Sequence, residues 1–112
     1  MDKLSKGDYL SDFEQLALTA VSLLGENAYG MTIHERMEGL ASGKRIVSLG
    51  AVYTTLDRLQ QKGYVKSHFG GATEERGGRS KRYFEITGAG ARALKNSLVV
   101  AGNLLRELGY VG

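Results

Sequence analysis

The sequence predicts a mainly α-helical α+β fold in which three helices, a small β-hairpin and a last helix follow one another. Three observations support this prediction. Apolar residues recur at helical intervals in four segments, two short stretches rich in β-forming residues flank a glycine-rich segment, and 112 residues is a typical length for one domain. With 42% apolar and 24% charged residues, the chain has enough apolar material for a core.

The first two helices are expected to begin at capping residues. Ser11 and Glu14 have the spacing of a capping box, and Gly25 is expected to end the first helix. Thr32 and Glu35 repeat the capping pattern at the start of a second, shorter helix. The residues expected on the buried side of the first helix are Phe13, Leu16, Ala17, Ala20, Leu23 and Leu24.

A third helix is expected after a short connection. Ser42-Gly43 is expected to end the second helix, and residues 44–47 are expected to form a connector strand. Ser48 can cap the third helix, and Gly63 is expected to end it as a left-handed residue. The residues expected to face the core are Val52, Leu56 and Leu59.

A hairpin and a terminal helix complete the predicted fold. Residues 64–69 and 82–86 are expected to be strands, and the glycine-rich residues 70–81 the hairpin tip. Thr87 is expected to cap the last helix, whose apolar residues follow a 3,4,3,4,3 spacing: Ala91, Leu94, Leu98, Ala101, Leu105 and Leu108. Further apolar residues widen this surface, so we expect it to form a homodimer contact; the alternative is a helix packed only on its own domain.

Positive charge is concentrated in the middle of the chain, although the net charge is only +3. Residues 44–82 carry nine Lys or Arg against three acidic residues, a net charge of +6, whereas residues 1–43 have a net charge of −4. A basic segment inside a globular domain favours a polyanionic partner such as nucleic acid. A solvated charged surface is the alternative.

The order of elements is that of a winged helix-turn-helix with a C-terminal dimerisation helix. We expect residues 1–87 to form a winged-helix DNA-binding domain and residues 88–112 the dimerisation helix. The third helix is expected to place its outer side in the major groove of double-stranded DNA, and the hairpin to contact the backbone or minor groove. The predicted DNA contacts are Ser48, Gly50, Ala51, Tyr53, Thr54, Thr55, Arg58, Lys62, Arg79, Ser80, Lys81 and Arg82.

Two of these predictions leave alternatives open. Thr54 and Thr55 can bind phosphates or meet thymine methyl groups, but threonines on a helix surface are also commonly just solvated. Tyr53 can pack its ring on the core and can offer its hydroxyl to a phosphate.

Three groups of residues, in chain order, are shared with a known family. They are Tyr29-Gly30 with Ile33; Gly50-x-x-Tyr53-x-x-Leu56-x-Arg58-Leu59 with Gly63; and Arg82-Tyr83-Phe84-x-Ile86-Thr87-x-x-Gly90. In this arrangement the chain resembles the PadR family of bacterial repressors, in its subgroup with a short C-terminal helix. The resemblance implies a dimer that binds inverted-repeat operators, and a possible small-molecule effector site at the dimer interface. The chain has no tryptophan to stack on such a ligand, and Thr54 stands where many relatives have proline.

These observations predict a sequence-specific transcriptional regulator, a repressor that binds its operator as a homodimer. The alternative is a winged-helix module that binds another protein and not DNA. We expect neither catalysis nor a cofactor, because His34 and His68 lack companion ligands at metal spacing and the glycines lack a phosphate-loop pattern. The lack of cysteines, of a signal-peptide pattern and of a long apolar run leads us to expect a cytoplasmic protein that does not enter membranes.

Overall fold

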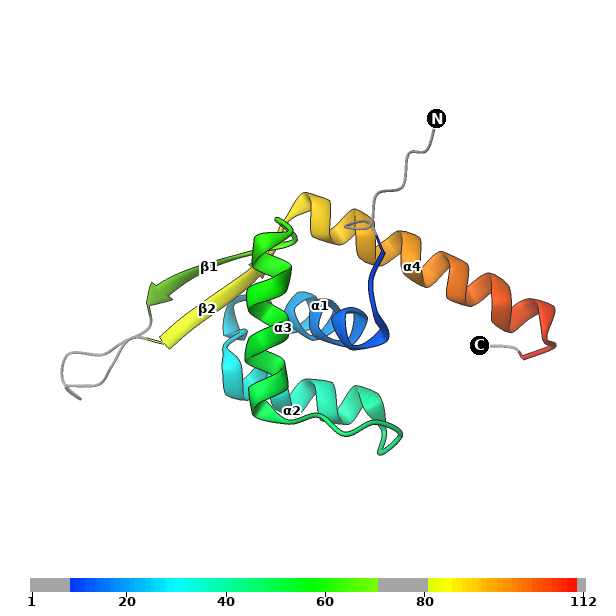
Figure 1. Ribbon diagram of the computed structural model, residues 1–112, viewed down its shortest axis with the longest axis horizontal. Helices are drawn as coiled ribbons and strands as arrows, with labels where there is room; N and C mark the ends of the chain where they lie inside the picture. The colour runs from blue at the N-terminus through cyan, green and yellow to red at the C-terminus, as the bar shows by residue number, and fades with distance from the viewer. Residues whose placement is uncertain (1–8, 71–80, 111–112) are drawn as a thin grey trace.

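The computed structural model describes residues 9–70 and 81–110, which form a helical body with a β-hairpin extending from one side and the last helix from the other (Figure 1). This arrangement confirms the predicted fold class. The elements are α1 (Asp12–Leu24), the short 3-10 helix η2 (Gly25–Asn27), α2 (Gly30–Ala41), α3 (Leu49–Gln61), β1 (Val65–Gly70), β2 (Lys81–Ile86) and α4 (Gly88–Glu107). None of the helices in the described part of the chain is both long and apolar enough to cross a membrane.

α1 begins as predicted, with a complete capping box. The backbone N–H of Glu14 donates to Ser11 Oγ at 3.1 Å, and the backbone N–H of Ser11 donates to Glu14 Oε1 at 2.9 Å. The helix ends at Leu24, and Gly25 has a φ of +59°. Leu23 was expected on the buried side, but it is 55% exposed, so this part of the prediction is wrong.

α2 begins three residues earlier than the sequence pattern suggested. Its N-cap is Tyr29, and Thr32 lies inside the first turn, where its Oγ accepts from the backbone N–H of Tyr29 at 3.0 Å. The helix ends before Ser42, which has a φ of +53°. Residues 44–47 form no strand, so this prediction is also wrong; the carbonyl of Val47 instead lies 2.8 Å from His34 Nε2.

The hairpin is fixed to the helical body along one edge. β1 and β2 are antiparallel, with Val65 opposite Ile86 and Phe69 opposite Arg82. The backbone N–H of Phe84 also donates to the carbonyl of Ala28 at 2.9 Å, beyond the hairpin itself. β2 therefore pairs on both sides, which limits how the hairpin can move relative to the helices.

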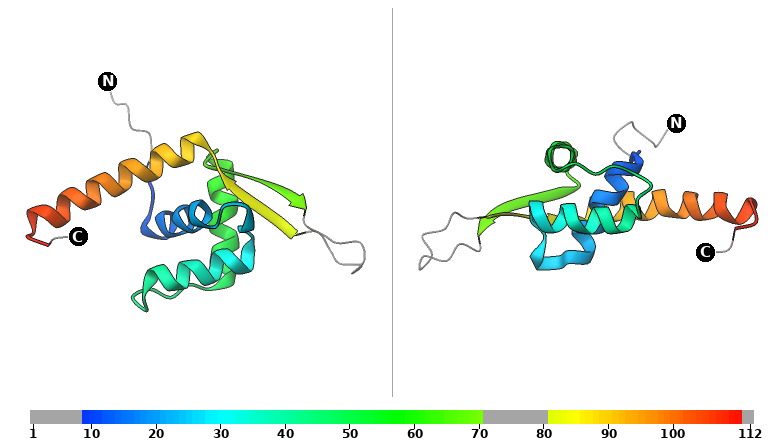
Figure 2. Two further views of the ribbon diagram at one scale, coloured as in Figure 1. Left: turned by 180° about the vertical axis from the view of Figure 1, so that it is seen from behind. Right: turned by 90° about the horizontal axis from the view of Figure 1, so that it is seen from below.

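The core lies between α1, α2, α3 and the inner side of the hairpin. The largest of its fully buried side chains are Phe84, Leu18, Ile33, Met37, Leu56 and Leu59. α4 contributes only its first turns to this core, through Gly90, Ala93 and Leu94. The rest of α4 extends away from the body, as both views in Figure 2 show.

Gly90 is expected to be necessary for stability, because α4 approaches the chain closely at this residue. A Cβ on Gly90 would lie 2.1 Å from the backbone oxygen of Tyr64. Gly90→Ala is therefore expected to lower the free energy of unfolding by about 1–3 kcal/mol, measured by urea denaturation. Gly39→Ala in α2 is the control: a Cβ there meets nothing within 4 Å, and alanine favours a helix by up to about 1 kcal/mol. Equal stability of the two variants would contradict this account.

Candidate nucleic-acid interface

α3 buries one side and exposes the other. Its buried residues are Val52, Thr55, Leu56 and Leu59. Ser48 caps the helix as predicted, accepting from the backbone N–H of Ala51 at 3.2 Å, and Gly63 follows it with a φ of +81°. The right-hand view of Figure 2 shows α3 end-on, at one side of the molecule, with its outer side not covered by another described element. A partner can reach its outer side without any rearrangement of the described elements.

Thr55 does not belong to the exposed side. It is only 4% exposed, so the prediction that it faces outward is wrong. Thr55 follows Val52 by three residues and precedes Leu59 by four, and residues at these spacings share one side of a helix. The helical spacing in the sequence therefore already indicates that Thr55 belongs to the buried side. Thr54, the neighbouring residue, is exposed.

Tyr53 packs its ring against the start of α2 and remains 41% exposed. A Cβ on Gly30 would lie 1.9 Å from the hydroxyl oxygen of Tyr53, so only glycine leaves room for the ring in this position. The contact explains why Gly30 and Tyr53 occur together in the motifs found in the sequence. It agrees with the ring packing expected for Tyr53; the contact of its hydroxyl with a phosphate stays a prediction.

Two predicted DNA contacts, Lys62 and Arg82, are bound by the chain itself. Lys62 Nζ lies 2.8 Å from Oε2 of Glu14, a residue that is only 3% exposed. Arg82 donates to three side chains, at 3.1 Å to Asp57, 3.0 Å to Gln60 and 3.2 Å to Ser67. These bonds hold α3 to α1 and to the hairpin, so both residues position the surface rather than extend from it.

Glu14 is ionised under ordinary conditions despite its burial. Burial raises the pKa of this carboxyl group, but the hydrogen bonds from Lys62 and the Ser11 backbone and the positive charges of Lys62 and Arg58 lower it. The net result is a pKa below the usual carboxyl value. A charged Glu14 therefore holds the C-terminal end of α3 at neutral pH.

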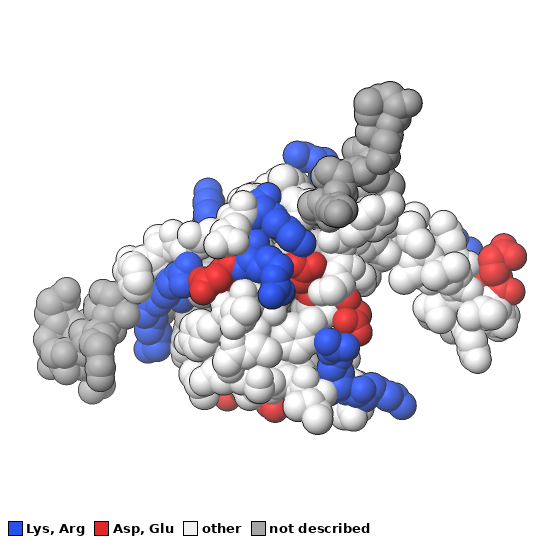
Figure 3. Space-filling model, in the orientation of Figure 1, with Lys and Arg blue, Asp and Glu red and all other residues white. Residues whose placement is uncertain are grey.

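Arg58 is the free cation of α3. It is exposed and makes no hydrogen bond or ion pair with any residue in ranges 9–70 and 81–110. Lys81 is also exposed and lies 5.0 Å from the centre of the Tyr29 ring. Figure 3 shows Lys and Arg side chains over the C-terminal end of α3 and along the hairpin, with acidic side chains between them. Arg79 and Ser80, also predicted contacts, lie outside the described residues.

The outer part of α4 exposes most of the predicted dimerisation residues. Leu98, Leu105 and Leu108 are 47%, 46% and 71% exposed. Leu94 is only 8% exposed and packs in the core of its own chain, so its prediction as a dimer contact is wrong. The prediction assumed one uniform stripe along the helix, whereas the first turns face the body. The other large exposed apolar residues of this region are Val99, Val100, Leu104 and Tyr110.

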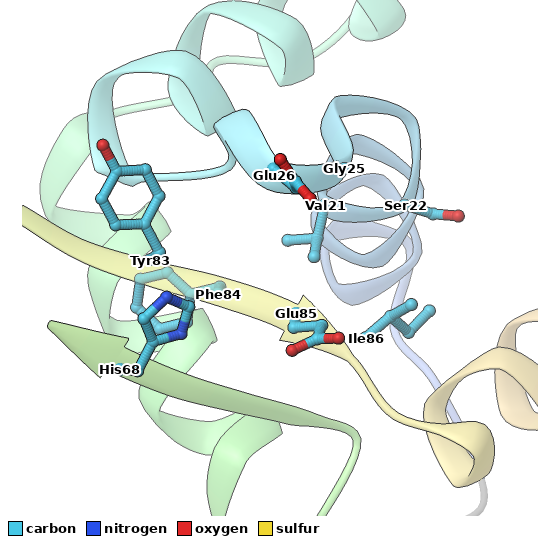
Figure 4. Close-up of a pocket in the computed structure, with 9 residues that line it drawn as sticks. All are labelled: Val21, Ser22, Gly25, Glu26, His68, Tyr83, Phe84, Glu85 and Ile86. Carbon is cyan, nitrogen blue, oxygen red and sulfur yellow. The ribbon is translucent and has the colours of Figure 1, made fainter. Parts of the chain in front are cut away.

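A pocket of about 620 Å³ lies between the end of α1, η2 and the hairpin (Figure 4). His68 and Tyr83 stack on one side of it, with ring centres 5.8 Å apart. Its charged lining residues are Glu26 and Glu85, without Lys or Arg, so it does not suit a polyanion.

Among the residues that the structure describes, no three His, Asp or Glu side chains are placed to hold a metal ion.

A family model for the PadR-like family of transcriptional regulators matches residues 21–96. The chain belongs to this PadR-like family. The match runs from the last turn of α1 through the hairpin into the first half of α4, so it includes α2, α3 and both strands. As a member of this family, the chain is a transcriptional regulator. No curated protein sequence matches it significantly.

Solved structures share the PadR-like fold. A PadR-like transcriptional regulator from Bacillus cereus is 22% identical, with a TM-score of 0.70, and 87% of each chain is covered. A transcriptional regulator from Clostridium thermocellum is 20% identical, with a TM-score of 0.68, covering 89% of this chain and 94% of that one. The Aeropyrum pernix ORC1 protein, solved in complex with DNA, is 26% identical with a TM-score of 0.66; the match covers 85% of this chain but only 26% of that protein.

The buried ion pair of this PadR-like regulator is expected to make its stability depend on pH. Because the pKa of Glu14 is lowered on folding, its ionised form stabilises the protein above the usual carboxyl range. This contribution is lost as the pH falls through the folded pKa. Glu14→Gln is therefore expected to cost about 1–3 kcal/mol at pH 7 and progressively less in acid, measured by urea denaturation between pH 7 and pH 3.

Glu26→Gln is the control for this measurement, because Glu26 is exposed and makes no ion pair with another described residue. It is expected to leave both the stability and its pH dependence close to those of the unchanged protein. If Glu14→Gln lowered the free energy of unfolding by the same amount from pH 7 to pH 3, the carboxylate charge would not be what stabilises this contact.

Proposed function

We propose that this regulator binds double-stranded DNA with α3 in the major groove and the hairpin along the backbone. The observation that carries the proposal is the exposed side of α3, where Gly50 and Thr54 are followed by Arg58, unpaired among the described residues, beside a hairpin that carries further Lys and Arg side chains (Figure 3). A major groove admits a helix only if the outer side of the helix is compatible with base edges and phosphates. The DNA complex of the Aeropyrum pernix relative supports this use of the fold.

The residues divide into two roles. Gly50 and Ala51 allow the helix to approach the bases, while Arg58 reaches a guanine edge or a phosphate. Lys81 contacts the backbone, and so do Arg79 and Ser80 if the hairpin tip follows the DNA as the sequence predicts. Lys62 and Arg82 act within the protein, where they fix α3 to α1 and to the hairpin.

We further propose a homodimer that binds an inverted-repeat operator and represses transcription by occupying it. The outer part of α4 supports this proposal, because a projecting helix with several large exposed apolar residues is typical of a protein interface. A twofold dimer would present two α3 helices to successive major grooves, about 34 Å apart. The protein then acts in the cytoplasm, by binding and without catalysis.

An effector could act on the same α4 surface. A groove of about 390 Å³ there is lined mainly by apolar residues, among them Ala91, Leu98 and Val99. An apolar compound in this groove would change how the partner helix packs, and thereby the relative placement of the two α3 helices.

Arg58→Ala tests the proposed DNA contact. The variant is expected to bind a selected operator about tenfold more weakly, to discriminate less well against random duplex, and to show a smaller salt dependence. The measurement is a mobility shift at several salt concentrations. Arg106→Ala, in the last turn of α4, is the control and should behave like the unchanged protein. If the unchanged protein bound no duplex even at low salt, DNA binding would be refuted in favour of a protein-binding module.

Leu98→Glu tests the proposed dimer. A charge placed in an apolar interface must be desolvated without a partner, so the variant is expected to sediment as a monomer. Phe69→Glu is the matched control, because Phe69 is an equally apolar residue on the hairpin and is 71% exposed. A dimer that survived Leu98→Glu unchanged would place the interface elsewhere.

A further inference from the structure

The N-terminal end of α3 exposes aliphatic side chains. Ile46, in the connection before the helix, is 91% exposed, and Leu49, its first residue, is 37% exposed. Val47 between them is only 6% exposed, and its carbonyl bonds to His34. The backbone between the two exposed side chains is therefore attached to α2.

Few polar groups accompany these side chains. Residues 46–52 contain one hydroxyl group and no amide, carboxylate or cationic side chain. That hydroxyl, Ser48 Oγ, caps the helix by accepting from the backbone N–H of Ala51. One turn later, the hydroxyl of Thr54 donates to the carbonyl of Gly50 at 3.1 Å. The hydroxyl groups of Ser48 and Thr54 thus already bond to the helix backbone, and the other side chains of residues 46–52 cannot form hydrogen bonds.

An apolar surface in the major groove has one kind of apolar partner on the base edges, the C5 methyl group of thymine. The N-terminal residues of a recognition helix are the ones that meet base edges. We propose that Ile46 and Leu49 determine specificity by contacting thymine methyl groups in each operator half-site. This inference rests on the proposed function. Arg58, nine residues after Leu49 and about two and a half turns further along α3, supplies the charged contacts.

Deoxyuridine provides the sharpest test, because it differs from thymidine only by lacking this methyl group. An operator is first selected from random duplexes with the unchanged protein, and each thymine is then replaced by deoxyuridine in turn. Replacement at one or two positions in each half-site is expected to weaken binding about threefold to fourfold, the effect of one buried methyl group. Binding is measured by fluorescence anisotropy.

Variants link the methyl groups to their partners. Ile46→Ala and Leu49→Ala should bind the thymine operator more weakly, and each should lose sensitivity to deoxyuridine at the position that its side chain contacts. Both residues are exposed, and circular dichroism checks that the variants fold. Leu23→Ala, a similar truncation of an exposed leucine at the end of α1, is the control and should keep full sensitivity.

The outcomes separate this inference from the proposed function. A selected operator that binds equally well with deoxyuridine at every position overturns the methyl contacts but leaves DNA binding intact. Sensitivity to deoxyuridine that persists in both Ile46→Ala and Leu49→Ala overturns the assignment to these residues. Failure to select any duplex overturns the proposed function, and the inference with it.

Discussion

The structure depends on how firmly one side of α3 is held. Four of its residues, Val52, Thr55, Leu56 and Leu59, are buried against the core, so the helix cannot roll without exposing apolar surface. Two polar contacts then fix its C-terminal half: Glu14 binds Lys62 from α1, and Asp57 and Gln60 bind Arg82 from the hairpin. α3 and the hairpin consequently form one surface with a defined shape, and recognition of a DNA duplex requires such a surface.

The same contacts reduce the positive charge that is available to bind phosphates. Arg45, Lys62 and Arg82 all form ion pairs with acidic residues of the chain, so their charges are largely compensated before any partner arrives. Attraction to phosphates therefore relies on fewer cations than the sequence count suggests, with Arg58 and Lys81 prominent among those described. With fewer cations to attract phosphates, more of the binding free energy has to come from contacts with base edges. The aliphatic N-terminal end of α3 is suited to such contacts.

Local patterns in the sequence predicted most of the fold. They could not predict contacts between residues that are far apart in the chain. The caps of α1, α3 and α4 were correct because each cap bonds to a residue three positions away. α2 was placed too late because Thr32 bonds back to Tyr29 from inside the helix. The Lys62 and Arg82 contacts were missed because their acidic partners stand 48 and 25 residues away, where no periodic pattern links them.

The start of α4 connects the proposed dimer surface to the proposed DNA surface. Thr87 Oγ donates to the carbonyl of Gly63, directly after α3, at 2.7 Å, and the backbone N–H of Thr87 donates to the carbonyl of Tyr64 at 3.0 Å. Gly90 then packs against the same Tyr64 backbone. Because α4 is one uninterrupted helix, a change in the angle of its outer part must either move the end of α3 or break these contacts. The proposed effector on α4 would therefore have a direct mechanical route to the proposed recognition helix.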